Sequence, residues 1–254
     1  MLRTFLCCII FFTAFSVIAG TRHPDVSDEE IVKYGNNFIH TVIIVGHTND
    51  NKTFIGSGVA ISKNIVLTAA HVIHNAKDGM VSIPYQKKAW KIEHAILHSD
   101  FELKNFGEYD IAILVLSGDM NFKWYPSLYE ETNELDKVCS LSGYGATGTF
   151  ETGISKELKP KLRAGSNIVT SKFKHLLICD ASKKKETELE YLINIGDSGG
   201  PLYIENKIAG IHSGVIASDG EANGGYGDQS GHTRVSLYRD WIKRNMEPHL
   251  DKER

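Results

Sequence analysis

The sequence lacks a strong excess of either charge. Its 28 Lys and Arg residues stand against 31 Asp and Glu residues, which leaves a formal net charge of -3. Proteins that bind nucleic acid usually present a basic face, so this balance argues against nucleic acid as a partner. The basic run at 183–185 is followed at once by glutamates, and we interpret it as a solvated loop.

Long apolar runs are absent beyond the first twenty residues. At the start, one positive charge precedes an almost wholly apolar stretch from Phe5 to Ala19. The small residues Val17 and Ala19 complete a pattern typical of a signal peptide over residues 1–19, cleaved before Gly20. The stretch is shorter than the ~20 apolar residues that span a bilayer, with an uncleaved anchor as the alternative. We therefore expect a secreted, periplasmic or extracellular protein with no stable membrane insertion after signal removal.

Cysteine is scarce. Of the four cysteines, Cys7 and Cys8 lie in the signal segment, which leaves Cys139 and Cys179. In an oxidising compartment these two would form one bridge. A bridge requires their Cα atoms to lie within about 7 Å of each other, which the sequence does not reveal. One disulfide and two free thiols therefore remain as alternatives.

Repeats and low-complexity tracts are also absent, and the 254 residues suffice for one large domain or two small lobes. Short runs rich in β-branched residues, separated by Gly, Asn, Asp and Ser, predict an all-β protein. These runs are Thr41–Val45, Gly58–Ile61, Ile65–Thr68, Ile111–Leu116, Val138–Ser142, His175–Cys179 and Lys207–Ile211. Only the end is clearly helical, because an apolar stripe from Val235 to Met246 stops before Pro248.

The strongest local motif surrounds Ser198, in the heptapeptide from Gly196 to Leu202. A serine between small residues is exposed on a tight turn, where its hydroxyl can reach a substrate carbonyl. The glycines allow backbone N–H groups to point outward and hold the oxyanion that develops during attack. The motif thus predicts a nucleophilic serine, with Asp197 beside it in the chain.

A serine hydroxyl needs a general base, and His71 is the candidate. It follows the strand-like run 65–68 through a turn of small residues. Asp110 is the candidate for the acid that orients the imidazole ring, because it directly precedes the apolar run 111–116. Taken alone, His71 would be a structural histidine and Asp110 an ordinary turn residue.

Together these motifs resemble the trypsin/chymotrypsin-like serine proteases over nearly all of the chain after the signal. The resemblance rests on Thr68-Ala69-Ala70-His71, Tyr109-Asp110-Ile111-Ala112-Ile113-Leu114, Gly143-Tyr144-Gly145 and the unchanged serine motif. It implies two antiparallel six-stranded β-barrels with the active site in the cleft between them, plus a C-terminal helix. The corresponding boundaries are about 31–125 and 130–234 for the barrels and 235–247 for the helix, within a protease domain at 20–254. The start of the chain and its few cysteines are more similar to the bacterial secreted branch.

The resemblance also implies residue roles. Ser198 would be the nucleophile, His71 the general base and then acid, and Asp110 its orienting group. The backbone N–H groups of Gly196 and Ser198 would form the oxyanion hole. Ser213 resembles a serine beside the aspartate, on a segment that pairs with substrate backbone. No cofactor or metal is implied, the partners would be protein or peptide substrates, and we expect a monomer.

Some positions depart from the family pattern. Gly214 stands where a tryptophan usually follows the family's serine, and Asn194 replaces a cysteine. Cys139 resembles a family cysteine whose usual partner position is Ile204 here. The resemblance therefore does not decide between a bridge and free thiols.

Activation has two alternatives. In the resembling family the acid at Asp197 pairs with a newly made α-amino group. Signal cleavage before Gly20 would give an enzyme active on secretion, whereas a cut before Ile31 would give a zymogen. The number of residues from Ile31 to His71 favours the second alternative, whereas Glu30 and the residues after Val32 argue against it. We favour the first.

The residues expected to line the specificity pocket argue against a preference for Lys or Arg before the scissile bond. No acid lies between 191 and 195, where Ile193 is a candidate pocket residue together with Ser213 and Gly214. His212 and His232 resemble the positions that carry pocket histidines in glutamate-specific members of the family, and imidazole N–H groups can donate to a carboxylate. Two ordinary hydrogen-bonded histidines in an apolar pocket would instead favour medium-sized apolar side chains. Both readings stay open.

Two other functions compete with a serine endopeptidase. The serine motif also satisfies Gly-x-Ser-x-Gly, the nucleophile elbow of esterases. That fold needs a helix after the serine, whereas Pro201 and a strand-like run follow here. A catalytically silent binding protein with the same fold is the second rival, although such proteins usually lose a triad member. Labelling of Ser198 by a serine-directed phosphonylating reagent separates enzyme from binder.

Overall fold

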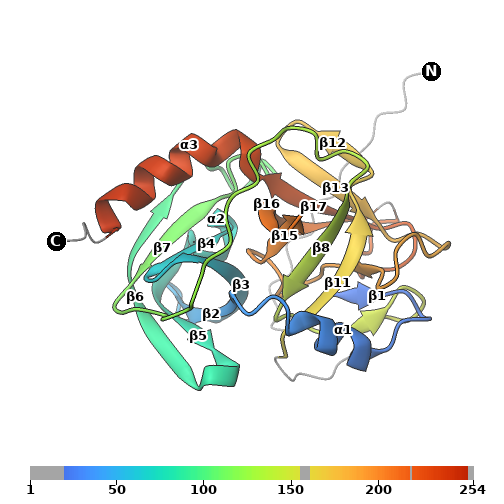
Figure 1. The fold of residues 1–254 in the computed structure, drawn as a ribbon, viewed down its shortest axis with the longest axis horizontal. Coiled ribbons are helices and arrows are strands. Elements are labelled where there is room, and N and C mark those ends of the chain that lie inside the picture. Colours follow the sequence, from blue (N-terminus) through green and yellow to red (C-terminus); the bar gives the residue numbers. More distant parts are fainter. Residues whose placement is uncertain (1–19, 155–160, 218, 251–254) are drawn as a thin grey trace.

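The computed structural model describes residues 20–154, 161–217 and 219–250. The expected signal segment lies outside these residues. Within them, no helix is long and apolar enough to cross a bilayer. Figure 1 shows two β-structures side by side, with one long helix lying along the upper side of the first.

The first β-structure is a closed barrel in the order β2-β3-β4-β7-β6-β5. Its strands are β2 (Thr41–Thr48), β3 (Thr53–Ser62), β4 (Ile65–Thr68), β5 (Ala76–Ile83), β6 (Lys88–Leu97) and β7 (Ala112–Leu116). β4 and β7 are buried along their whole length, as their unbroken apolar runs indicate. They are antiparallel neighbours with Thr68 opposite Ala112, so the end of β4 lies beside the start of β7.

The second β-structure is a seven-stranded sheet in the order β11-β8-β15-β16-β17-β13-β12. Its strands are β8 (Val138–Gly143), β11 (Arg163–Ile168), β12 (Ser171–Phe173), β13 (Leu176–Asp180), β15 (Pro201–Ile204), β16 (Lys207–Ile216) and β17 (Gln229–Arg234). The all-β fold is confirmed, but this half has seven strands and an open hydrogen-bond order instead of six strands in a closed barrel. The Asn167 side chain on β11 donates to the Asp180 carbonyl on β13 at 3.1 Å, but among the described residues no strand ladder joins these two strands.

A small sheet joins the beginning of the described chain to the second half, in the order β10-β9-β1-β14. Its strands are β1 (Thr21–Arg22), β9 (Gly148–Thr149), β10 (Gly153–Ile154) and β14 (Tyr191–Leu192). β1 lies between β9 and β14, so the first described residues hold together two segments that are distant in sequence.

The helices are α1 (Asp28–Gly35), α2 (Ala70–Ile73) and α3 (Val235–Met246), with short 3₁₀ turns at Pro84–Gln86 and Glu247–His249. α3 confirms the predicted C-terminal helix and buries Val235, Tyr238 and Ile242 on one face. These side chains share a core with residues of both β-structures, including Leu67 and Ile211. The helix therefore helps to fix the two halves against each other.

Sequence reasoning missed α1, although its capping signal was present. The Ser27 hydroxyl accepts from the Glu30 N–H and the Glu30 carboxylate accepts from the Ser27 N–H, a reciprocal capping box. The helix packs on the second half, because the fully buried Ile31 belongs to the core that contains Leu141 and Tyr191. Ile31 is thus a core residue of the second half, although the expected boundary assigns it to the first barrel.

Candidate active site

His71 and Asp110 meet because the strands that precede and follow them are neighbours. His71 lies in α2, just after β4, and Asp110 lies just before β7. The Asp110 carboxylate accepts from the His71 backbone N–H at 2.8 Å and from His71 Nδ1 at 2.7 Å. Two bonds to one carboxylate fix both the backbone and the ring of the histidine. The other ring nitrogen, Nε2, is then the one that can take up a proton.

The electrostatics of this pair suit a general base. Burial tends to lower the pKa of His71, but the charge of Asp110 and its hydrogen bond outweigh burial and raise that pKa. Burial tends to raise the pKa of Asp110, whose side chain is 3% exposed, but the interaction with His71 and a hydrogen bond from Ser213 hold it below its ordinary value. Asp110 therefore stays ionised and stabilises the imidazolium form of His71.

Ser213 contacts the same carboxylate from the second half of the molecule. It lies on β16, and its hydroxyl donates to Asp110 Oδ2 at 2.5 Å. The aspartate is thus bonded from both β-structures, which places it at their junction. The expected position of Ser213 beside the aspartate agrees with this contact.

Ser198 lies on the turn between β14 and β15, half-buried and against the first barrel. Its carbonyl accepts from the Ser57 N–H on β3 at 2.7 Å. The next residue, Gly199, has φ +83°, and a Cβ there would lie 2.1 Å from the Thr68 hydroxyl and 3.1 Å from the Ala69 nitrogen. Only glycine fits, and the turn therefore sits directly beside the segment that leads into His71. Within the described residues, no hydrogen bond joins the Ser198 hydroxyl to the imidazole ring.

Two N–H groups of the turn have no hydrogen-bond acceptor among the described residues. The N–H groups of Asp197, Gly199 and Gly200 donate to backbone carbonyls. Those of Gly196 and Ser198 donate to no acceptor in the described part of the chain. An N–H group without a protein partner can serve a ligand, which is what an oxyanion hole requires.

Asp197 is fully buried and has no cation bonded to it among the described residues. Its carboxylate accepts from Gly145 N at 3.0 Å, Asn194 N at 3.1 Å and the Tyr191 hydroxyl at 3.3 Å. Burial outweighs these hydrogen bonds and raises the pKa of Asp197 from 3.8 to about 6. The site thus holds a carboxylate that a neighbouring positive charge would stabilise.

Gly20 lies next to this carboxylate, on the far side of Tyr191. The buried Gly20 nitrogen donates to the Tyr191 hydroxyl at 3.0 Å, and that hydroxyl donates in turn to Asp197. A Cβ on Gly20 would lie 2.1 Å from the Tyr191 ring, so the close approach requires glycine. Two hydrogen bonds therefore connect the residue that follows the expected cleavage point to the residue before the candidate nucleophile.

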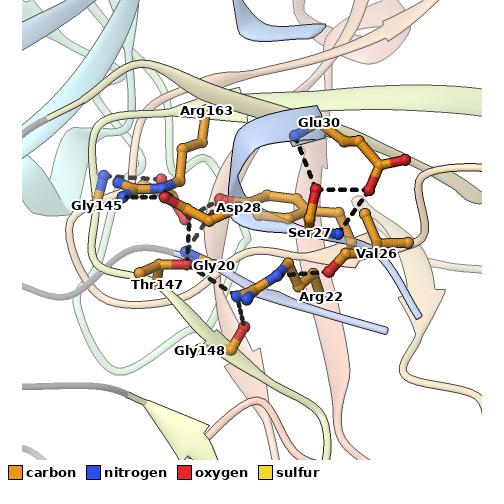
Figure 2. A network of polar contacts seen from close by, with 12 residues as sticks. Gly20, Arg22, Val26, Ser27, Asp28, Glu30, Gly145, Thr147, Gly148 and Arg163 are labelled. Atoms are coloured by element: carbon orange, nitrogen blue, oxygen red, sulfur yellow. Dashed lines mark hydrogen bonds and ion pairs between the residues drawn. The ribbon is translucent and has the colours of Figure 1, made fainter. Parts of the chain in front are cut away.

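A polar network holds this first segment in place. Figure 2 shows Arg163 bonded to Asp28, from its Nε to Oδ1 at 2.7 Å, and Thr147 donating to the same carboxylate oxygen at 3.1 Å. Arg22 donates to the Gly148 carbonyl at 2.7 Å. The network joins residues 22–28 to the loop that follows Gly145 and to β11.

Ile31, the other candidate for a new N-terminus, lies inside α1. The bond between Glu30 and Ile31 falls within the first turn of that helix, and the Ile31 side chain is fully buried. A cut there would remove the capping box and release a core residue. This geometry favours Gly20 over Ile31 as the residue that faces Asp197.

The two candidate pocket histidines bond to each other. His212 Nδ1 lies 2.9 Å from His232 Nδ1, His212 Nε2 lies 3.2 Å from the Ser142 carbonyl, and His232 Nε2 lies 2.9 Å from the Ser230 hydroxyl. Both histidines are fully buried, and burial lowers the pKa of His232 to about 3 and that of His212 well below its ordinary value. All four ring nitrogens therefore have partners inside the protein, and both rings are neutral.

The remaining pocket positions are apolar or already bonded. Ile193 is buried, and Gly214 is half-buried on β16. Glu190, the nearest acid in sequence, accepts from the backbone N–H groups of Ser182 and Glu186. No group of three or more His, Cys, Asp or Glu side chains arranged to hold a metal ion is found in the described ranges.

The chain is similar to known proteases over most of its length. A family model described as Trypsin matches residues 34–242. Mast cell protease 3 of Ovis aries is 28% identical over 219 residues, which cover 77% of this chain and 79% of that protein. The chymase of Rattus norvegicus is 26% identical over 94% of this chain and 96% of its own length. These relatives come from animals and do not support a bacterial branch.

Solved structures share the fold. The structure of HL collagenase superposes with a TM-score of 0.67 at 21% identity, covering 82% of this chain and 94% of that one. Neuropsin, a serine protease expressed in the limbic system of mouse brain, gives a TM-score of 0.65 at 19% identity, covering 84% and 96%. At these sequence identities, the structural similarity establishes a shared fold.

Proposed function

Because this chain belongs to the trypsin family and is a serine-type endopeptidase, we propose that it is exported and cleaves proteins through Ser198, His71 and Asp110. One observation carries the assignment: the bonded His71–Asp110 pair lies beside the Ser198 turn, and two N–H groups of that turn have no protein acceptor among the described residues.

In this mechanism the Ser198 oxygen attacks the substrate carbonyl while its proton passes to His71 Nε2. The ionised Asp110 stabilises the imidazolium that forms. The carbonyl oxygen becomes an oxyanion, to which the N–H groups of Gly196 and Ser198 donate. His71 then returns the proton to the leaving amine, which leaves an acyl group on Ser198. Water activated by His71 releases the acyl group by the same steps in reverse order.

The experiment is a phosphonylating inhibitor combined with Ser198→Ala. The reagent should label one site, Ser198, and the variant should lose on the order of 10⁴ to 10⁶ in rate. Ser171→Ala, on the exposed strand β12, is the matched control and should keep full activity. A folded Ser198→Ala protein that keeps more than a few per cent of the activity would overturn the assignment. An inert wild-type protein would indicate the silent binder instead.

Activation would follow from signal removal alone. Cleavage before Gly20 would convert its nitrogen into an α-amino group beside Tyr191 and Asp197, which supports an enzyme that is active on secretion. The alternative cut before Ile31 would break α1. N-terminal sequencing of the active secreted protein tests this, and a start at Ile31 would refute it.

For the residue before the cut, the observations support a medium-sized apolar side chain. The neutral, mutually bonded pair of His212 and His232 offers no free N–H to an acidic side chain, and the two oxygens of Glu190 already accept backbone bonds. Peptides that differ only in this residue should be cleaved faster with Leu than with Glu or Arg. Faster cleavage of the Glu peptide would contradict this prediction and support an acid-binding pocket formed by His212 and His232.

A further inference from the structure

The residue directly before Asp110 has an unusual backbone conformation. Tyr109 has φ +55°, which lies in the left-handed region that a large side chain rarely adopts. The Ile111 N–H donates to the Tyr109 carbonyl at 2.8 Å, so the chain turns tightly with Asp110 at the centre of the turn. A strained conformation of this kind persists only where the surrounding structure holds it. The direction of the Asp110 side chain therefore depends on the contacts that fix Tyr109.

One of these contacts comes from the C-terminal helix. The Tyr109 N–H donates to the Tyr238 hydroxyl on α3 at 3.0 Å. Tyr238 is buried in the core that both β-structures share, so its hydroxyl is held on a rigid element. The Tyr109 ring packs edge-on against the Tyr238 ring, with centroids 5.9 Å apart, and stacks on His98 at 4.7 Å. Side chains outside the turn thus fix both the backbone and the ring of Tyr109.

The Tyr238 hydroxyl is held in turn by His175, which directly precedes β13. Because the Tyr109 N–H can only donate, the single proton of the hydroxyl is left for another acceptor. His175 Nδ1 lies 2.7 Å from the hydroxyl and accepts this proton. Nε2 then carries the ring proton and lies 3.3 Å from a carboxylate oxygen of Glu108. Since Glu108 precedes Tyr109 in the chain, these four residues close a cycle of contacts around the turn.

The second half of the molecule anchors this cycle. The Arg234 N–H on β17 donates to the His175 carbonyl at 2.8 Å. The Thr233 hydroxyl on the same strand donates to the Gly107 carbonyl at 3.3 Å. The turn that carries Asp110 belongs to the first half, so its position depends on how the two halves dock.

We propose that Tyr238 and His175 are positioning residues that act through the Tyr109 backbone to hold Asp110 against His71. The proposal rests on the function proposed above. Among the described residues, neither side chain is hydrogen-bonded to Asp110 or His71, so any effect on catalysis passes through the turn. Asp110 makes its bonds to His71 at 2.7 and 2.8 Å, and a rotation of the turn would lengthen both. A displacement of about 1 Å caused by a distant mutation can cost on the order of 100-fold in rate.

The first test is Tyr238→Phe, which keeps the ring and removes only the hydroxyl. It should lower kcat by on the order of 10- to 100-fold and leave KM unchanged, because the hydroxyl is bonded inside the protein. The midpoint of the pH–rate profile should also fall, because a displaced Asp110 raises the pKa of His71 less. Tyr129→Phe is the matched control, since it removes a buried hydroxyl bonded to Asn133 at 2.6 Å, and should change neither quantity. A folded Tyr238→Phe protein with wild-type kcat and midpoint overturns the proposal.

Two variants of His175 test the same chain of bonds without a change in α3. His175→Asn keeps a side-chain acceptor near the place of Nδ1, whereas His175→Leu removes it. His175→Leu should lower kcat as Tyr238→Phe does, and His175→Asn should keep most of the activity. Equal activity of these two variants overturns the proposal, and this comparison decides the matter if Tyr238→Phe does not fold. Combining His175→Leu with Tyr238→Phe should add little further loss, because both break one chain of bonds.

Phosphonate labelling of Ser198 keeps the two proposals apart. Wild-type protein that is not labelled refutes the protease assignment and, with it, the positioning role. Labelled wild-type protein together with Tyr238→Phe labelled at the same rate refutes only the positioning role. Slower labelling of Tyr238→Phe, with wild-type labelling of Tyr129→Phe, is the result expected.

Discussion

The buried Asp197 makes the stability of the protein depend on the charge at Gly20. Its folded pKa of about 6 lies above its ordinary value of 3.8, a difference that corresponds to roughly 3 kcal/mol. A raised pKa means that the folded state favours protonated Asp197. The stabilising contribution is complete below pH 3.8 and is lost as the pH rises through about 6. Where Gly20 carries no charge, the protein should therefore lose stability over this range.

A free α-amino group at Gly20 should reverse that loss. It would be separated from Asp197 by the two hydrogen bonds of the Tyr191 hydroxyl, 3.0 and 3.3 Å long. Opposite charges about 6 Å apart attract by roughly 3 kcal/mol at an effective dielectric constant of about 20. The attraction thus has the same size as the penalty of ionising Asp197. Both groups are charged between about pH 6 and pH 8, so the effect should be greatest there.

The assay compares the free energy of urea unfolding for two forms of the Ser198→Ala protein, which cannot digest itself. One begins with free Gly20 and the other with Gly20 acetylated, which removes the charge with little added bulk. Between pH 4 and pH 7, the free energy of unfolding of the free form should rise by up to about 3 kcal/mol relative to that of the acetylated form. Tyr191→Phe in both forms shows how much of the gain needs the intervening hydroxyl. A difference that stays constant from pH 4 to pH 7 would refute the coupling.

Three further predictions concern the site and the core. The value of kcat/KM should rise with pH as His71 loses its proton. The midpoint should lie above 6.5, because Asp110 raises the pKa of His71. A midpoint below 6 in the pH–rate profile would contradict the hydrogen-bonded pair. Gly199→Ala should cost at least about 1–2 kcal/mol, measured by thermal unfolding, because φ is +83° and the new Cβ would collide with a side chain. Cys139 and Cys179 are buried with their sulfurs 3.7 Å apart, and burial raises the pKa of Cys179, so iodoacetamide should modify both thiols only after unfolding. Rapid modification of the native protein would disprove that burial.

Local patterns were sufficient for much of the fold. The apolar runs 65–68 and 111–116 predicted strands and the stripe from Val235 predicted α3, because each pattern depends only on residues close together in the chain. The capping box at Ser27 was equally local and would have revealed α1. The open order of the second sheet was not predictable, because strand pairing depends on contacts between segments far apart in the chain.

The sequence by itself determined the identities of the chemical groups: a serine on a glycine-rich turn, a histidine after one buried strand and an aspartate before another. Only the tertiary structure decided which groups meet. The ladder of β4 and β7 brings His71 to Asp110, and the bond from Ser57 brings the Ser198 turn to the same barrel. It also decided that His212 and His232 form a hydrogen bond with each other and that the Phe106 ring packs against Gly214. A motif consists of residues that are neighbours in the chain, so the sequence reveals it directly. Burial and hydrogen-bond pairing depend on contacts between segments far apart in the chain, and these contacts form only when the whole core assembles.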